Sequence, residues 1–274
     1  METESHLGGH NSKTNIDVSL LNYLKDLGVK SMLDIGCGPG GMVDCANKIG
    51  INAVGIEGDI NCKGNKIINF DLTNDVTSLI TELRERFSHF DCIYSCEFLE
   101  HVEEKYQSNY MKLFELGKMC VITAAPPKWK GIHHVNCRTT EYWIKVFNDY
   151  KFIHSPYYTS KCREKTRMRV PDTKKRNEKA SNKEFIRIRG LAFLNTKIQD
   201  NDFIGNVQFI NVTKKELISK INKNLEFDKN KIHICPEYVC QKENYKIKRD
   251  DNLYDIELPL IGIIDKTDSK INQS

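Results

Sequence analysis

A glycine-rich loop preceded by an acid is the first feature of the sequence with chemical consequences. Residues Asp34 to Gly40 run Asp-Ile-Gly-Cys-Gly-Pro-Gly and follow a short apolar segment. Glycines between a strand and a helix let a ligand approach the backbone closely. A carboxylate two residues before the first glycine would repel a pyrophosphate, whereas it would attract an amine. The loop therefore predicts a site for a cationic or amine-bearing ligand rather than for a dinucleotide.

Two further groups of side chains could hold a metal ion or move a proton. Glu97-Phe-Leu-Glu100-His101 follows one predicted buried strand, and His133-His134 follows the next. Both segments should lie at the carboxyl edge of a parallel sheet, beside the glycine loop. Carboxylates favour Mg²⁺ or Mn²⁺, and imidazoles shift the preference toward Mn²⁺, Fe²⁺ or Zn²⁺. Without a metal, His133 or His134 would act as a general base.

Alternating strand and helix patterns provide the framework that positions these residues. Such alternation indicates crossover units and a parallel sheet. Beyond residue 158 it stops, and we expect an antiparallel pair formed by a strand near Ile153 and a strand at Phe185–Leu194. The predicted fold class is α/β, with a Rossmann-like, mostly parallel seven-stranded sheet and a C-terminal α+β extension. The other predicted strands are 29–35, 51–56, 66–70, 91–95 and 119–124, and the predicted helices are 16–27, 42–49, 76–87, 105–116 and 140–150.

Composition narrows the class of protein. The 274 residues are 39% hydrophobic and 28% charged, which permits a sizeable core. No apolar run approaches the roughly 20 residues needed to cross a bilayer, so we expect no membrane association. The N-terminus is polar, and several of the ten cysteines stand in apolar runs. These features predict a cytoplasmic protein with reduced thiols.

The chain divides into three predicted parts. Residues 1–15 should form a lid or leader, 16–195 the main domain and 196–274 an extension of unknown role. A basic connection at 159–184 should join the last two strands of the main domain. In the extension, a capping box at Thr213–Glu216 predicts a helix.

The pattern Asp34-x-Gly36-x-Gly38-x-Gly40 resembles the first motif of class I S-adenosylmethionine (SAM)-dependent methyltransferases. Glu57, at the end of the second predicted strand, resembles the acid with which this family holds the ribose hydroxyls. Asp71 stands where the family contacts the adenine. The resemblance covers about residues 31–194 and implies a SAM-dependent methyltransferase. It implies a cofactor set of Asp34, Gly36, Cys37, Gly38, Gly40, Glu57, Gly58, Phe70, Asp71 and Glu97.

The pattern Glu-x-x-Glu-His, followed by a histidine after the next strand, resembles two methyltransferase groups. These are the small-RNA 3′-terminal 2′-O-methyltransferases and the ubiquinone-biosynthesis O-methyltransferases. The resemblance implies a metal, Mg²⁺ or Mn²⁺, that chelates the acceptor hydroxyl. Other members of the superfamily carry an acid–histidine pair here without a metal, and the histidine then positions the acceptor. Carried over, the metal ligands would be Glu97, Glu100, His101 and His133 or His134, and the catalytic residues His101, His133 and His134.

Three functions follow from these patterns. The first is methyl transfer to the hydroxyl of a small molecule or glycan, the second is RNA 2′-O-methylation, and the third is SAM binding without catalysis. Lys161–Arg189 holds twelve Lys/Arg and four Asp/Glu, a net charge of +8, which favours RNA. Only Tyr157 and Tyr158 are near enough to stack on bases, which argues against RNA. His133–Trp143 also resembles viral and bacterial methyltransferases of unassigned acceptor. We therefore predict the first function, with no prediction of oligomeric state.

Overall fold

The computed structural model describes residues 12–170 and 181–198, together with short strands within 207–265. Residues 1–11 of the predicted lid and the capping box at Thr213–Glu216 lie outside the described residues. Two small ribbons fall in the predicted extension: β10 (Val207–Gln208) pairs with β13 (Ile264–Asp265), and β11 (Tyr245–Arg249) pairs with β12 (Asn252–Ile256). Among the described helices, none has the length and apolar character that crossing a membrane would require.

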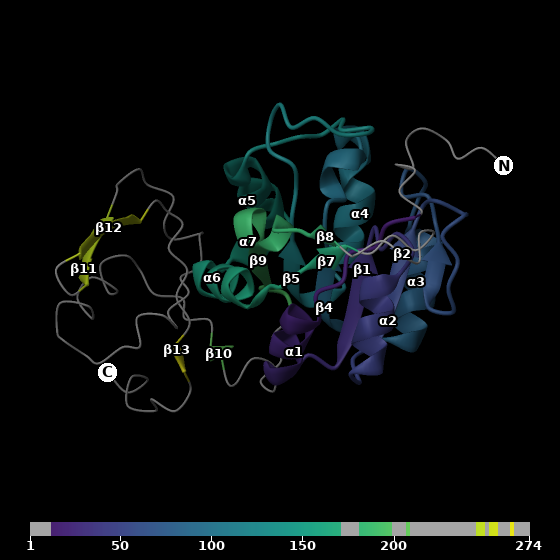
Figure 1. Cartoon of the computed structure of the whole chain (residues 1–274), viewed down its shortest axis with the longest axis horizontal. Coiled ribbons are helices and arrows are strands. Elements are labelled where there is room, and N and C mark those ends of the chain that lie inside the picture. Colours follow the sequence, from purple (N-terminus) through teal and green to yellow (C-terminus); the bar gives the residue numbers. More distant parts are fainter. Residues whose placement is uncertain are drawn as a thin grey trace.

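A seven-stranded sheet in the order β3-β2-β1-β4-β5-β9-β6 forms the centre of the fold (Figure 1). Strands β1 to β5 are parallel, and β9 runs antiparallel to both β5 and β6. The order reverses at β1, which lies between β2 and β4, and ligands of such sheets bind at this point of the carboxyl edge. The predicted Rossmann-like α/β sheet is therefore confirmed. The strands are β1 Ser31–Ile35, β2 Asn52–Glu57, β3 Ile67–Asn69, β4 Phe90–Ser95, β5 Gly117–Ile122, β6 Phe152–His154 and β9 Leu191–Asn195.

Helices cover both faces of this sheet because its central strands are apolar on both sides. Met32 packs into one core with helices α1, α2, α6 and α7, whereas the next residue, Leu33, packs into a second core with α3, α4 and α5. The helices are α1 Val18–Asp26, α2 Gly41–Lys48, α3 Thr77–Arg86, α4 Gln107–Phe114, α5 Thr140–Asp149, α6 Pro156–Lys165 and α7 Phe185–Arg189. Two short 3₁₀ helices, Leu99–His101 and Glu104–Tyr106, follow β4, and β7 (Arg169–Val170) pairs with β8 (Ser181–Asn182).

The predicted strand at Phe185–Leu194 is wrong in its first half. Phe185–Arg189 forms the helix α7, and the strand β9 begins only at Leu191. A strand would place Ile186 and Ile188 on the same face, yet Ile186 is buried and Ile188 is 65% exposed. The turn from α7 into β9 is tight, because a Cβ on Gly190 would lie 2.5 Å from the carbonyl oxygen of Ile186. The prediction fails here because isoleucines and arginines alternate at 186–189, a pattern typical of a strand, although the segment is helical.

The basic connection begins inside a helix rather than in a loop. Ser155 caps α6 by accepting a hydrogen bond from the Tyr158 amide, and Pro156 occupies the first helical position. Tyr158 is buried, and Tyr157 packs against the same core. Tyr158 is therefore not placed to stack on an RNA base, whereas Tyr157 remains partly exposed.

Candidate active site

The glycine loop lies between β1 and α2, at the carboxyl edge of the sheet. The amides of Gly36 and Cys37 both donate to the carbonyl of Ile56, at 2.9 and 3.1 Å, which ties the loop to β2. Gly36 has a φ of +75°, and a Cβ there would lie 2.5 Å from Cδ2 of Phe98. The loop therefore needs glycine at this position both for its backbone conformation and for the close approach of Phe98.

The carboxyl groups of Asp34, which is buried, and Glu57, which is partly buried, make this end of the site acidic. Glu57, the last residue of β2, accepts hydrogen bonds from the amides of Gly38 (2.7 Å) and Asp59 (3.0 Å). Burial raises the pKa of Glu57 although these amides oppose the shift. Burial, and then the charge of Glu57, raise the pKa of Asp34 to about 8. A ligand that carries positive charge would relieve both effects.

The N-terminal segment Ser12–Asp17, here called the strap, holds the loop from the other side. Thr14 Oγ1 accepts a hydrogen bond of 2.7 Å from the amide of Gly41, the first residue of α2. This bond satisfies one of the amides that a helix N-terminus leaves unpaired. Lys13, Thr14 and Asn15 all line the pocket described next. Sequence reasoning missed Thr14 because the bond joins two segments 27 residues apart.

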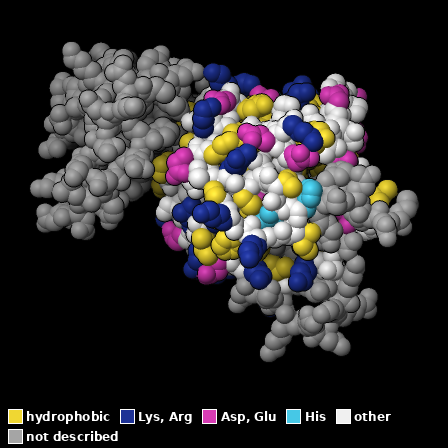
Figure 2. Space-filling view, turned by 90° about the horizontal axis from the view of Figure 1, so that it is seen from above, with side chains coloured by type: hydrophobic (Ala, Val, Ile, Leu, Met, Phe, Trp, Pro, Cys, Tyr) yellow, Lys and Arg dark blue, Asp and Glu magenta, His cyan; other side chains and the backbone are white. Residues whose placement is uncertain are grey.

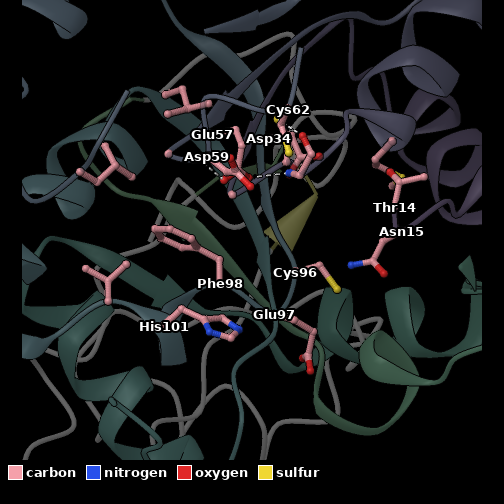
Figure 3. A pocket seen from close by; sticks show the side chains of 18 of the residues that line it. Thr14, Asn15, Asp34, Glu57, Asp59, Cys62, Cys96, Glu97, Phe98 and His101 are labelled. Carbon is pink, nitrogen blue, oxygen red and sulfur yellow. Dashed lines mark hydrogen bonds between the residues drawn. The ribbon is translucent and has the colours of Figure 1, made fainter. Parts of the chain in front are cut away.

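A pocket of about 600 Å³ connects the acidic end with the histidines. Its size is within the range of sites for small ligands. Figure 3 shows Asp34, Glu57 and Asp59 at one end, Glu97 and His101 at the other, and Phe98 between them. Gly40 and Glu100 are not among the residues that line it. The predicted residues that do line it are Asp34, Gly36, Cys37, Gly38, Glu57, Gly58, Phe70, Asp71, Glu97, His101, His133 and His134.

Thr123 and Arg189 hold Glu97 in position. Its φ of +57° is unusual for a residue with a side chain. Its amide donates to Thr123 Oγ1 at 2.8 Å, and that hydroxyl lies 2.8 Å from Glu97 Oε1. Its other carboxylate oxygen forms an ion pair with Arg189, whose side chain is nearly buried. Neither Thr123 nor Arg189 carried a signal in the sequence, since both bonds depend on tertiary packing.

Glu100, His101 and His134 form a three-residue cluster at the histidine end. One nitrogen or oxygen atom from each lies within 4.8 Å of the others. The rings of His101 and His134 meet edge to face at 4.9 Å. Nδ1 of His134 lies 3.0 Å from the carbonyl oxygen of Trp129. That contact fixes the orientation of the ring through Nδ1. Histidines that bind a metal through one ring nitrogen are typically held in this way through the other.

His133 takes a different place from its neighbour. It lines the pocket but is not part of the cluster, and its φ is +50°. Nε2 of His133 is buried and has no hydrogen-bond partner within the described parts of the chain. The structure therefore brings together Glu100, His101 and His134 of the predicted ligands, and leaves His133 and Glu97 outside the group.

The environment of Glu100 suits a cation. The side chain is fully buried, and neither carboxyl oxygen has a hydrogen-bond partner among the residues that the structure describes. Burial, and then the charge of Glu97, raise its pKa, although the backbone amides of Glu100 and Ala125 and the charge of Arg189 oppose the rise. A buried acid in this state costs stability unless it is protonated or paired with a cation. One carboxylate and two imidazoles are a donor set that leaves open positions on a divalent metal.

Comparison with known proteins gives one family match. Residues 12–115 match the family model described as a methyltransferase domain. No curated protein matches the chain in sequence. Among solved structures, the chain is similar to the SAM-bound magnesium protoporphyrin IX methyltransferase of Synechocystis PCC 6803, at 15% identity and a TM-score of 0.39, over 65% of this chain and 76% of that one.

Two further solved structures give weaker coverage of this chain. A SAM-dependent methyltransferase from Archaeoglobus fulgidus is 17% identical with a TM-score of 0.37, over 48% of this chain and 67% of that one. The methyltransferase domain of a bacterial Hen1 is 17% identical with a TM-score of 0.35, over 50% and 84%. The family match covers the glycine loop, β1 to β4 and the start of the histidine end, so residues 12–115 are those of a methyltransferase domain.

Proposed function

We propose that this domain transfers a methyl group from SAM to a hydroxyl of a small molecule or glycan, assisted by a divalent metal. The observation that carries the proposal is the Glu100–His101–His134 cluster. A fully buried carboxyl group without a partner stands beside two imidazoles, and both imidazoles line the same pocket as the glycine loop. A bound Mn²⁺ or Mg²⁺ would lower the pKa of a hydroxyl that it contacts.

The acidic end of the pocket would hold the methyl donor. The glycine loop offers backbone without Cβ atoms, and Asp34 and Glu57 offer charge to the donor's amine and acceptors to its hydroxyls. Phe70 and Asp71, after β3, line the same end and would contact the base of the donor. When bound, SAM supplies the reactive methyl group.

The histidine end would hold the acceptor. His134 is oriented through Nδ1 by the Trp129 carbonyl. The buried Glu100 carboxyl group requires either a cation beside it or a bound proton. In the alternative without metal, His133 would take the acceptor proton, since its buried Nε2 lacks a partner among the described residues. In both cases transfer requires the acceptor oxygen to be held in line with the methyl group.

Methyl transfer to catechol, sugar and short RNA acceptors tests the proposal, with EDTA and then with added Mn²⁺ or Mg²⁺. We expect transfer to need the metal and to fall about 10- to 100-fold in Glu100→Gln and in His134→Gln, the scale on which changes around metal sites act. Glu82→Gln and His89→Gln remove the same groups at exposed positions away from the pocket and should leave transfer unchanged. Transfer that needs no metal and is unchanged in Glu100→Gln would reject the proposed metal assistance. SAM binding without transfer to any acceptor would indicate that the protein binds SAM but is not an enzyme.

A group of lysines in and near the pocket favours RNA as a second candidate acceptor. Lys13 and Lys183 line the pocket, and Lys128 and Lys130 flank Trp129, which is 52% exposed. Within the described residues, no ion pair engages these four lysines, whereas Lys161, Lys165 and Arg187 pair with glutamates. Figure 2 shows histidine side chains at the surface with Lys and Arg around them. Phosphate binding here would make transfer to RNA fall steeply with salt, while transfer to a neutral acceptor would not.

A further inference from the structure

The ion pair between Arg189 and Glu97 joins two segments of the active site that are 92 residues apart. Both side chains are largely buried. The Arg189 guanidinium lies over two rings, 4.8 Å from the centre of Trp129 and 5.2 Å from that of Phe185. Aromatic faces attract a guanidinium and restrict its movement. These two rings therefore hold the Arg189 guanidinium in position independently of its ion pair with Glu97.

The helix that carries Arg189 is itself anchored. The side chain of Arg163, on α6, donates a hydrogen bond of 2.8 Å to the carbonyl of Gly190, the residue after Arg189. Ile186 of α7 is fully buried in the core. The backbone at Arg189 is therefore anchored to the rest of the domain. The contact of Arg189 with Glu97 does not depend on the conformation of a loop.

Glu97 is the predicted metal ligand that the structure leaves out of the cluster. One of its oxygens is close to Thr123 and the other is paired with Arg189. Glu100, only three residues further on, forms no ion pair within the described residues and joins His101 and His134, although the charge of Arg189 also acts on it. Two acids of the same motif are thus divided between an arginine and a cluster of histidines.

We propose that Arg189 is a positioning residue that keeps Glu97 out of the Glu100–His101–His134 cluster. The proposal rests on the metal-assisted function proposed above. A metal held by three protein ligands keeps open positions for the acceptor, and a fourth ligand from Glu97 would occupy one of them. Without the Arg189 guanidinium, the Glu97 carboxylate would lose its ion-pair partner. A metal ion in the nearby cluster would then be its strongest available partner.

Titration of the whole chain with Mn²⁺, followed by calorimetry without SAM or acceptor, tests this role. The variants are Arg189→Gln, Glu97→Gln, the double variant, and Glu100→Gln. Arg187→Gln is the matched control, because it removes an arginine from the same helix that pairs with Glu184 instead. Thermal unfolding of each variant establishes that it is folded.

We expect Arg189→Gln to bind Mn²⁺ about tenfold more tightly than the wild type, because ligand charge tunes such sites on this scale. The gain should be absent from the double variant and from Arg187→Gln. Glu97→Gln alone should leave Mn²⁺ affinity within about twofold of the wild type. A gain that persists in the double variant would show simple relief of charge repulsion and would overturn the proposal.

The remaining outcomes separate this role from the proposed function. Mn²⁺ binding that Glu100→Gln weakens but Arg189→Gln leaves unchanged keeps the metal site and overturns the role of Arg189. A loss in Glu97→Gln as large as that in Glu100→Gln makes Glu97 a ligand and also overturns it. No binding by any variant rejects both. Should Arg189→Gln not fold, Trp129→Leu removes one ring from the guanidinium, and unchanged Mn²⁺ affinity there counts against the proposal.

Discussion

Asp34 and Glu57 set the electrostatics of the acidic end of the pocket. Asp34 is buried and Glu57 is partly buried, and burial, followed by the charge of Glu57, raises the pKa of Asp34 to about 8. A positively charged ligand would favour the ionised form of Asp34 and lower this pKa. The affinity of the domain for SAM should therefore depend on pH in a range where ordinary aspartates do not titrate.

The first prediction concerns this pH dependence. Because the pKa of Asp34 is higher in the free protein than in the complex, SAM binding releases a proton below about pH 8. SAM affinity should therefore rise as pH increases toward about 8 and become constant above it. Calorimetry in buffers of different ionisation enthalpy measures both the affinity and the proton release.

Asp34→Asn is the informative variant for this prediction. It should weaken SAM binding by about 1–3 kcal/mol, the range for a lost charge-assisted hydrogen bond. It should also abolish the proton release that we assign to Asp34. Glu57→Gln should weaken binding by a similar amount, since Glu57 also orients the Gly38 amide. An affinity that stays constant across this pH range in the wild type would contradict the placement of the donor's cation at Asp34.

At the scale of elements, the start of α2 depends on a residue outside the helix. Gly40, with a φ of +80°, stands at the N-cap position and has no side chain to offer, so Thr14 of the strap accepts the amide of Gly41 instead. A Cβ on Gly41 would lie 2.5 Å from Thr14, so the two segments are in close contact. The strap thus stabilises both α2 and the glycine loop that precedes this helix.

The second prediction is that Thr14→Ala weakens both folding and SAM binding. Loss of a helix cap costs about 1 kcal/mol, and the strap also lines the donor pocket. Chemical denaturation and SAM calorimetry measure the two effects. Thr139→Ala is the matched control, since Thr139 caps α5 through the Tyr142 amide and does not line the pocket. It should lower stability by a similar amount without a change in SAM affinity, and an equal loss of affinity in both variants would refute a specific role for Thr14.

At the scale of the whole molecule, the strap joins the N-terminal side of the domain to the start of the basic connection. Ile16 pairs with Arg169 through two backbone hydrogen bonds of 2.8 Å. Asp17 is fully buried and accepts hydrogen bonds from the Leu20 amide, the Arg167 amide and the Thr166 hydroxyl. One aspartate therefore caps α1 and holds a segment about 150 residues further along the chain.

The third prediction is that Asp17→Ala destabilises the protein by about 3 kcal/mol. Its removal leaves several buried donors unsatisfied, each of which costs on the order of 1–3 kcal/mol. The change in the free energy of unfolding comes from urea denaturation. Asp26→Ala, at an exposed position of the same helix, should change that free energy by less than about 0.5 kcal/mol. Equal effects of the two substitutions would mean that Asp17 does not link the segments as described.

The sequence alone was sufficient for the central sheet and for the glycine loop at its carboxyl edge. Apolar runs such as 51–56 and the glycines after Asp34 are local signals, and the carboxyl edge follows from parallel pairing. The strand predicted at Phe185–Leu194 was half wrong, because Ile186 and Ile188 alternate with arginines as in a strand, and only packing shows that one isoleucine is buried and the other exposed. The helix α6 was missed, because its charged residues obscured the capping signal of Ser155 and Pro156.

Which histidine joins Glu100, and what Glu97 contacts, could be decided only by tertiary structure. His133 and His134 are adjacent and chemically identical, and the backbone of their loop, with φ of +50° at His133, directs one into the cluster and the other elsewhere. Glu97 and Arg189 meet across 92 residues because β9 inserts beside β5 and sets α7 over the site. The sequence by itself thus determined the class of domain and its glycine loop, because those signals are local in the chain. The histidine end depends on contacts between distant segments, which no local pattern encodes.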